Sequence, residues 1–291
     1  MPDEGCPFLE MVRPPLQLFF FYTPFSKMES FLYIIYERGD YMDILLSRII
    51  RYLNGVITDD RQYRTALFMV EHYQELRCKT LEEIVKESEY TEEDIMTFIG
   101  YLGYHDYEDF RERLMMDQDL RSSQMQLRLL HTDIDGMISS LHISGSKEDF
   151  LNLVDHLAEI IYENGRIILA GGYSPLSVTV DFQTDMISMG KQAIEYHQFD
   201  KNFKFKDTDV VFFLTATGRA LSHVSKSLKE KGLCESHIVL MTQNIKYKNY
   251  DSICADDVVH VLGTFDGIEF NYQIMRLFDL IRIRYYTKYF I

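Results

Sequence analysis

The stretch DVVFFLTATGRALSHVSKSLKEKG, residues 209–232, decides the fold. An apolar strand runs into a short turn of small and hydroxyl-bearing side chains, and a helical pattern follows at once. Four other short apolar runs occur around it: RIILAGG at 166–172, QAIEYH at 192–197, HIVLMT at 237–242 and DVVHVLG at 257–263. Helical patterns alternate with these runs, which predicts a five-stranded parallel sheet with helices on both faces.

The loop AGGYS, residues 170–174, ends the first predicted strand. In doubly wound sheets, ligands bind beyond the carboxyl ends of the strands and near helix N-termini. Two glycines, Gly171 and Gly172, allow a close approach of the backbone, and Ser174 stands at a helix start. The first strand therefore ends in a candidate ligand-binding loop, although a plain strand-to-helix turn is the alternative for it.

The loop TATGRA, residues 215–220, ends the third predicted strand and precedes a helix. It places the hydroxyls of Thr215 and Thr217 and the amides of Gly218 and Arg219 around a helix N-terminus. Hydroxyls, free amides and the positive end of a helix favour a phosphate group. The dinucleotide pattern G-x-G-x-x-G is absent, so the pair of loops does not predict a nicotinamide or flavin dinucleotide site.

Residues 42–130 are predicted to be helical. Thr80 with Glu83 three residues later forms a capping box, and Gly103 is a plausible residue to end the last helix of the series. The third and fourth helices, joined by the short link Glu89–Tyr90, make a helix-turn-helix, for which plain helical packing is the alternative. The four helical patterns are 42–53, 63–72, 80–88 and 91–102.

The charge of this region argues against strong DNA binding. The whole chain carries a formal net charge of -15, and residues 81–114 hold eleven acidic residues against three basic ones. Most DNA affinity comes from neutralising phosphates, so an acidic face repels the duplex. The candidate DNA contacts that remain are Thr91, Thr97 and Tyr101 on the fourth helix, with Arg48 and Arg51 on the first.

The helical pair resembles a known DNA-binding module. Residues 80–114, TLEEIVKESEYTEEDIMTFIGYLGYHDYEDFRERL, are similar to the helix-turn-helix of the MurR/RpiR family of bacterial transcriptional regulators. The match covers the LEEI segment at 81–84 and the LGY segment at 102–104. It departs on the reading surface, where Thr97 replaces an arginine of the family.

The two loops resemble those of the SIS (sugar isomerase) domain, which the same family carries after its helix-turn-helix. The family patterns G-x-G-x-S and S-x-S-G-x-T are similar to residues 170–174 and 215–220, with Ala170 in place of the first glycine and Ala220 in place of the last hydroxyl. The resemblance implies that Ser174, Thr215 and Thr217 hold a sugar phosphate and that Arg219 adds positive charge. It also implies an all-helical domain followed by a five-stranded parallel α/β sandwich.

These observations predict a bacterial transcriptional regulator of carbohydrate metabolism that works as a homodimer or homotetramer. The alternative is a diverged sensor that binds a sugar phosphate but no longer binds DNA. A sugar-phosphate isomerase is a further alternative, because SIS folds occur in such enzymes and need a general base. Glu269, His223 and His260 are the available candidates, but none forms an acid–base pair at readable spacing, so we expect no catalytic residue.

The composition predicts four segments. We expect residues 1–41 to be an extension. Glu37–Gly39 can be encoded by AGG-rich codons just before Met42, as a bacterial ribosome-binding site would be if it were translated, so we expect Met42 to be the true start. A genuine partner-binding extension is the alternative. Residues 42–118 form the helix-turn-helix domain, 119–146 a linker helix, and 147–291 the SIS-like domain.

Several classes of site are not expected. The His and Cys residues do not recur at metal-ligand spacing, so neither a metal nor another cofactor is predicted. The four cysteines show no C-x-x-C pair, which favours buried, reduced thiols in a cytoplasmic protein. No apolar run approaches the ~20 residues that cross a bilayer.

Overall fold

Five parallel strands form the sheet of the computed structural model, in the order β2-β1-β3-β4-β5. This confirms the predicted parallel α/β domain. The structure describes residues 44–247, 254–265 and 267–290, so the extension 1–41 and the expected start at Met42 lie outside the described residues. The strands are β1 Arg166–Gly171, β2 Gln192–Glu195, β3 Asp209–Thr215, β4 His237–Thr242 and β5 Asp257–His260.

Strand β3 lies in the middle of the sheet and is buried along its whole length. Parallel strands covered by helices on both faces require such continuous apolar sequence, as the run VVFFL provides. Its register aligns Gly171 of β1 with Leu214, and Thr215 with Thr242 of β4. The loops that follow β1 and β3 therefore leave the same edge of the sheet.

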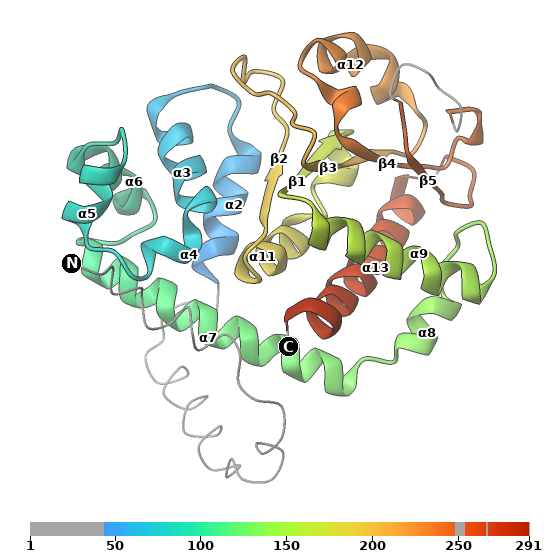
Figure 1. Ribbon diagram of the computed structural model, residues 1–291, viewed down its shortest axis with the longest axis horizontal. Coiled ribbons are helices and arrows are strands. Elements are labelled where there is room, and N and C mark those ends of the chain that lie inside the picture. The colour runs from blue at the N-terminus through green and yellow to red at the C-terminus, as the bar shows by residue number, and fades with distance from the viewer. Residues whose placement is uncertain (1–43, 248–253, 266, 291) are drawn as a thin grey trace. The chain divides into compact units, whose positions relative to one another are not determined.

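Helices cover the sheet on two sides (Figure 1). Helix α13 packs against α9, α10 and α11, while α12 contacts β3 from the opposite side. Three aromatic rings fix this core: Phe182 of α11 stacks on Phe278 of α13 with centroids 4.3 Å apart, and both meet Phe212 of β3 edge-on. The helices are α9 Lys147–Glu163, α10 Tyr173–Leu176, α11 Val180–Ser188, α12 Arg219–Glu230 and α13 Gly267–Tyr285, which ends in the π-helical turn η3 Tyr286–Phe290.

The sequence pattern after the AGGYS loop predicts one helix, with Pro175 in its first turn and its end at Met189. The structure has two helices there, so that prediction is wrong. Helix α10 ends at Leu176 and α11 begins at Val180. Ser177 Oγ donates to the carbonyl of Ser174, and Thr179 Oγ1 donates to the carbonyl of Leu176. Hydroxyls that bond to nearby backbone carbonyls in this way compete with a continuing helix.

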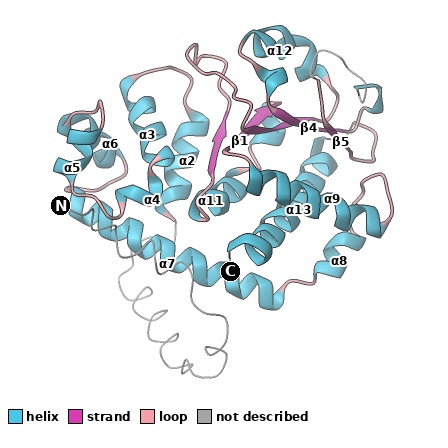
Figure 2. Ribbon diagram, in the orientation of Figure 1, coloured by secondary structure: helices cyan, strands magenta, loops and turns pink. Residues whose placement is uncertain are grey.

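The four helices expected between residues 42 and 102 are present (Figure 2), together with the short helix α4 that the sequence did not predict. Thr80 and Thr91 each accept from an amide three residues on and form complete capping boxes, and Asp60 caps α3. Gly103, at φ +92°, follows the end of α6 as expected. The helices are α2 Leu45–Gly55, α3 Arg61–Glu71, α4 Tyr73–Leu76, α5 Leu81–Glu87 and α6 Glu92–Tyr101.

The single linker helix expected to end near residues 144–146 is also wrong. Helix α7 runs without interruption from Tyr107 to His131, and a second helix, α8, spans Ile134–Ser139. Asp133 starts α8 by accepting the amide of Gly136, which favours a new helix start over continuation. The division of the chain into domains stays a prediction.

Ion pairs with a buried carboxylate hold helix α7 against the α/β domain. Asp185 of α11 has no exposed surface and contacts three guanidinium groups, from Arg121 and Arg128 of α7 and Arg282 of α13. Burial is the largest cause of a lowered pKa at Arg128, and the neighbouring charge of Arg282 acts in the same direction. A buried charge of this kind is tolerated only because its partners are in place.

Helices α2 and α3 contact the α/β domain through polar groups as well. Arg64 of α3 forms a two-point ion pair with buried Asp200, at 2.7 and 3.2 Å. Asn54 of α2 donates to Gln183 of α11 at 2.8 Å. Residues 45–290 accordingly belong to one compact unit. No helix in the described ranges is both long and apolar enough to span a membrane.

Candidate ligand-binding site

The loop after β1 is built around a glycine that no other residue can replace without movement. Gly171 has φ +132°, and a Cβ atom there would lie 2.1 Å from the carbonyl oxygen of Leu214 in β3. The next amide, of Gly172, donates to that same oxygen at 2.8 Å. The first loop is thus held directly against the end of β3, beside the second loop.

The loop after β3 brings the predicted hydroxyls and amides together. Thr215 Oγ1 accepts the amide of Gly218 at 3.1 Å, and Thr217 Oγ1 accepts the amide of Arg219 at 3.3 Å. Arg219 Nε also approaches Thr217 Oγ1, at 3.2 Å. A hydroxyl that accepts from an amide keeps its own proton as a donor. Both threonines can therefore donate to an anion at the start of α12.

Gly218 gives this loop its shape. Its φ of +83° lies in the left-handed region, where side chains other than glycine are strained. A Cβ atom at this position would meet the ring of Tyr247 at 2.0 Å. Asn244, which follows β4, donates to the carbonyl of Thr217 at 3.0 Å. The turn is consequently fixed from its own backbone and from the neighbouring strand.

The two loops flank the point where the connections of the sheet diverge. Strand β1 leads through α10 and α11 to β2, and β3 leads through α12 to β4, in the opposite direction along the sheet. In doubly wound sheets, the crevice outside the carboxyl ends of two such strands is the usual ligand site. The sequence-predicted residues Gly172, Ser174, Thr215, Thr217, Gly218 and Arg219 all lie at this edge.

Two further polar side chains belong to the same edge and were missed from the sequence. Asn271 of α13 donates through Nδ2 to Ser174 Oγ and to its carbonyl, both at 3.3 Å, and its buried Oδ1 has no partner among the described residues. Gln243, which follows β4, is 4% exposed, and neither atom of its amide group finds a partner there. Unpaired buried polar groups cost about 1–3 kcal/mol each, which a bound polar ligand would recover.

A signal for Gln243 existed in the sequence, because it directly follows the strand HIVLMT and so occupies a carboxyl end. Asn271 carried none, because it reaches the site from a helix 97 residues after Ser174. Only the packing of α13 against α10 brings it to the loop.

The groups considered as a general base lie in other arrangements. Glu269 pairs with His142 at 2.9 Å and accepts from Gln273. His260 contacts Ser144 Oγ at 2.7 Å and the carbonyl of Gln243 at 3.2 Å. The His223 side chain lies outside the described part of the structure. These partners do not align an acid and a base across the crevice.

In the helical region, some candidate DNA contacts are exposed, whereas others stabilise helix α6. Thr97 and Tyr101 are exposed on α6 beside Glu92 and Glu93, whereas Thr91 caps the helix. Arg48 donates to the carbonyl of Leu102 and so caps the C-terminal end of α6. Arg51 is exposed on α2 and also interacts with another group of the protein. Their role in DNA binding stays a prediction.

Other cations of this region are paired with its own acidic groups. Arg61 bonds to Asp94 at 2.8 Å, and Lys79 bonds to both Glu75 and Glu87. The hydrogen bond with Arg61 is the largest cause of the strongly lowered pKa of Asp94. These cations are less available to phosphates than the sequence implies.

The expectation of buried, reduced cysteines is wrong about burial at two positions and about the redox state at a third. Cys234 and Cys254 form no disulfide bond, but both are exposed because they lie in surface segments before β4 and β5. Cys78 is disulfide-bonded.

Neither a family model nor a curated protein matches this sequence. Among solved structures, the Vibrio vulnificus NanR protein complexed with ManNAc-6P is 14% identical with a TM-score of 0.39, over 84% of this chain and 92% of that one. A Listeria monocytogenes protein proposed to be a sugar-phosphate isomerase is 17% identical with a TM-score of 0.38, over 60% and 90%. Likenesses of this degree assign no ligand to the present chain.

Proposed function

We propose that the crevice beyond β1 and β3 binds a phosphorylated sugar and that this binding controls the helical region, as in a cytoplasmic transcriptional regulator of carbohydrate metabolism. One observation carries the proposal: the polar loops after β1 and β3 meet where the connections of the sheet run in opposite directions. There, the hydroxyls of Thr215 and Thr217 lie at the start of α12. A phosphate gains from these donors and from the helix N-terminus.

The sugar part of the ligand would contact the unpaired polar groups. Asn271 Oδ1 can accept from a sugar hydroxyl, and the Gln243 amide can both donate and accept. The exposed guanidinium of Arg219 would add charge at the phosphate. We assign binding rather than catalysis to this site, because Glu269 and His260 already hold other partners.

Control of the helical region would use the direct contacts between α2, α3 and the α/β domain. A ligand that moves α11 would act on Gln183 and so on Asn54 of α2. It would also act through Asp185 on helix α7. The proposal requires only that the ligand binds the two arrangements with different affinity.

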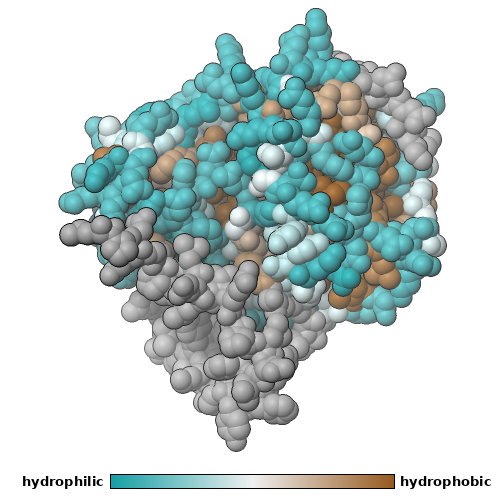
Figure 3. All heavy atoms as spheres, viewed as in Figure 1, coloured by the Kyte–Doolittle hydropathy of each residue, from teal (hydrophilic) through white to brown (hydrophobic). Residues whose placement is uncertain are grey.

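A second copy of this chain is the proposed oligomeric partner. Helix α13 exposes Ile268, Tyr272 and Met275 at spacings that place them on one helical face, and Leu151 of α9 is 42% exposed. In Figure 3 hydrophobic residues gather towards α8 and α9, while the side of α3 to α6 is mainly hydrophilic. Exposed apolar patches of this kind mark interfaces.

A sensor that does not bind DNA is the second candidate function. The acidic first turn of α6, with Glu92 and Glu93 exposed, favours it. So does the pairing of Arg61 with Asp94.

The test is thermal unfolding of the full chain with a panel of hexose and amino-sugar phosphates, each beside the matching free sugar and inorganic phosphate. A phosphorylated sugar should raise the midpoint, and the free sugar should not. The variants Thr215→Val and Thr217→Val should weaken binding by about tenfold or more. Thr208→Val, at the opposite end of β3, is the matched control and should bind normally. Equal midpoint shifts in all three variants would disprove the site.

Electrophoretic and anisotropy measurements on the DNA upstream of its own gene then separate the two candidates. Salt-sensitive binding that changes with the same sugar phosphate supports the regulator. Absence of binding to fragments tiled across the neighbouring genes, from protein that still responds to the sugar phosphate, supports the sensor.

A further inference from the structure

A second cluster of polar side chains lies at the amino edge of the sheet, away from the crevice. His156 projects from α9, His237 is the first residue of β4, and Asp257 is the first residue of β5. His237 and Thr242 stand at opposite ends of β4, roughly 16 Å apart at about 3.3 Å per residue. The cluster is therefore separate from the proposed phosphate site.

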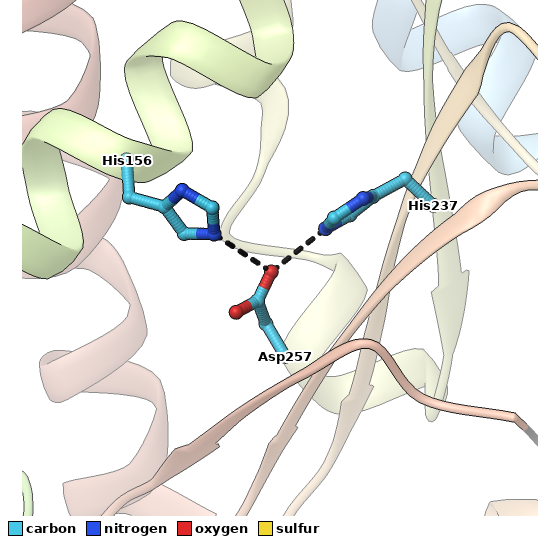
Figure 4. Close-up of side chains that lie close together, drawn as sticks. All are labelled: His156, His237 and Asp257. Atoms are coloured by element: carbon cyan, nitrogen blue, oxygen red, sulfur yellow. Dashed lines mark hydrogen bonds and ion pairs between the residues drawn. The ribbon is translucent and has the colours of Figure 1, made fainter.

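Both imidazole rings turn the same nitrogen towards one carboxylate oxygen (Figure 4). The distance from Asp257 Oδ2 to His237 Nε2 is 2.7 Å, and to His156 Nε2 it is 3.2 Å. The rings lie 6.3 Å apart between centroids with an interplanar angle of 71°, so they approach from different directions and do not stack. Three donor atoms, all within 4.8 Å of one another, thus surround a small space.

The separations suit a tetrahedral metal ion. Zinc binds imidazole nitrogen and carboxylate oxygen at about 2.0–2.1 Å, which places neighbouring ligands of a tetrahedron about 3.3 Å apart. The observed distances of 2.7 and 3.2 Å from the carboxylate oxygen are close to that value, and the two imidazole nitrogens lie within 4.8 Å of each other. We propose that His156, His237 and Asp257 form a binding site for a divalent transition metal ion of the Zn²⁺ class.

The ligand set decides the class of ion. Two imidazoles and one carboxylate suit zinc and its neighbours, whereas calcium and magnesium take oxygen ligands. Binding requires both Nε2 atoms to give up any proton they carry, after which each lone pair faces the ion. The His156 side chain is 50% exposed, so an ion can enter from solvent and keep a water molecule as its fourth ligand.

The nearby thiols are poorer ligands. Cys234 and Cys254 come three residues before His237 and Asp257, respectively. Burial, and then the hydrogen bond with Cys254, raise the pKa of Cys234 to about 11, and a thiol must lose its proton to bind a metal. The ion would instead join α9 to β4 and β5, linking residues up to 101 positions apart in the chain. It would act as a structural brace.

The experiment uses the full-length chain, freed of metal with a chelator that is then removed, and titrated with Co²⁺ and Zn²⁺. We expect one equivalent to bind, with the visible ligand-field bands of four-coordinate Co²⁺ and without a sulfur-to-cobalt charge-transfer band. Zn²⁺ should raise the thermal midpoint. His156→Ala, on the exposed side of α9, should weaken binding at least about tenfold, because even outer partners of metal ligands contribute about 10- to 100-fold.

Three controls make the result decisive. His142→Ala removes a more exposed histidine that faces one carboxylate, Glu269, and should leave binding unchanged. His237→Ala should abolish binding, with circular dichroism verifying its fold. Cys234→Ser should bind as the unaltered chain does. Equal affinity in His156→Ala and His142→Ala would overturn the proposal, as would absence of Co²⁺ bands at millimolar metal, or a sulfur charge-transfer band that Cys234→Ser abolishes.

Discussion

Helix α6 and the crevice beyond β1 and β3 both follow the local pattern of a binding motif, but they differ in their polar groups. The frame of α6 is complete: Thr91 and Asp94 cap the helix, and its apolar side chains Ile95 and Phe98 are buried. Its exposed face is acidic, and the nearby Arg61 is neutralised by Asp94. The crevice has both the frame and donors that an anion could use.

The difference shows that a motif's scaffold and its chemistry are set by separate residues. Caps and apolar side chains build a helix pair whether or not it binds DNA. In the crevice, the same Thr215 hydroxyl both shapes the turn and faces the proposed ligand. A substitution that removes this hydroxyl would therefore alter the turn and the proposed site together. The following predictions test this contrast and the connection between the two regions, from the largest expected effect to the smallest.

Asp185→Ala should destabilise the protein most, because it leaves three guanidinium groups without their buried partner. Breaking a buried pair costs about 3–5 kcal/mol. Urea unfolding followed by circular dichroism would measure it. The exposed pair of Asp155 with Arg284 is the control, and Asp155→Ala should cost at most about 1 kcal/mol. Equal losses would show that α7 is not held by this network.

Glu195→Gln should change how stability depends on pH. Burial raises the pKa of Glu195, at the end of β2, from 4.5 to about 7. The folded state therefore binds a proton that the unfolded state releases, so this group's contribution to stability falls as pH rises from about 4.5 to about 7. The decline amounts to at most about 3 kcal/mol.

In Glu195→Gln that part of the decline should vanish, while the exposed control Glu93→Gln should follow the unaltered protein. Unfolding free energies at pH 5, 6 and 7 would measure the difference. Parallel pH profiles for all three proteins would contradict a buried Glu195.

Reversing charge on α6 tests whether that helix approaches DNA. Glu92→Lys with Glu93→Lys leaves Asp94 untouched, because Asp94 is needed for the cap and for Arg61. If the helix lies near phosphates, affinity should rise roughly tenfold at low salt, and the salt dependence should steepen by about two phosphates. Anisotropy would measure both. Reversing Glu148, an exposed first-turn acid of α9, is the control. Equal gains from both changes would show general attraction only.

Ala220→Ser should have the smallest effect. It adds a hydroxyl in the first turn of α12, where the SIS pattern has one, and a hydrogen bond contributes about 0.5–1.5 kcal/mol. Phosphate-sugar affinity should improve about three- to tenfold by calorimetry. Ser227, later on α12, provides a control through Ser227→Ala. Weaker binding in Ala220→Ser would place the phosphate away from this turn.

Local sequence foretold much of the fold because its determinants are local. The apolar runs specified all five strands, and the pair Thr80 with Glu83 marked a true helix start. It failed where hydroxyls redirect the backbone, at Ser177 and Thr179, and at the second helix start of Asp133.

By itself the sequence determined the strands, the caps and the two polar loops, since each depends on neighbours a few residues away. Only the tertiary structure decided which distant groups meet. It paired Asp185 with three arginines and brought Asn271 to Ser174. It also gathered His156, His237 and Asp257, whose positions along the chain show no ligand spacing. Such groups meet because buried surfaces pack together, and a single sequence does not display that packing.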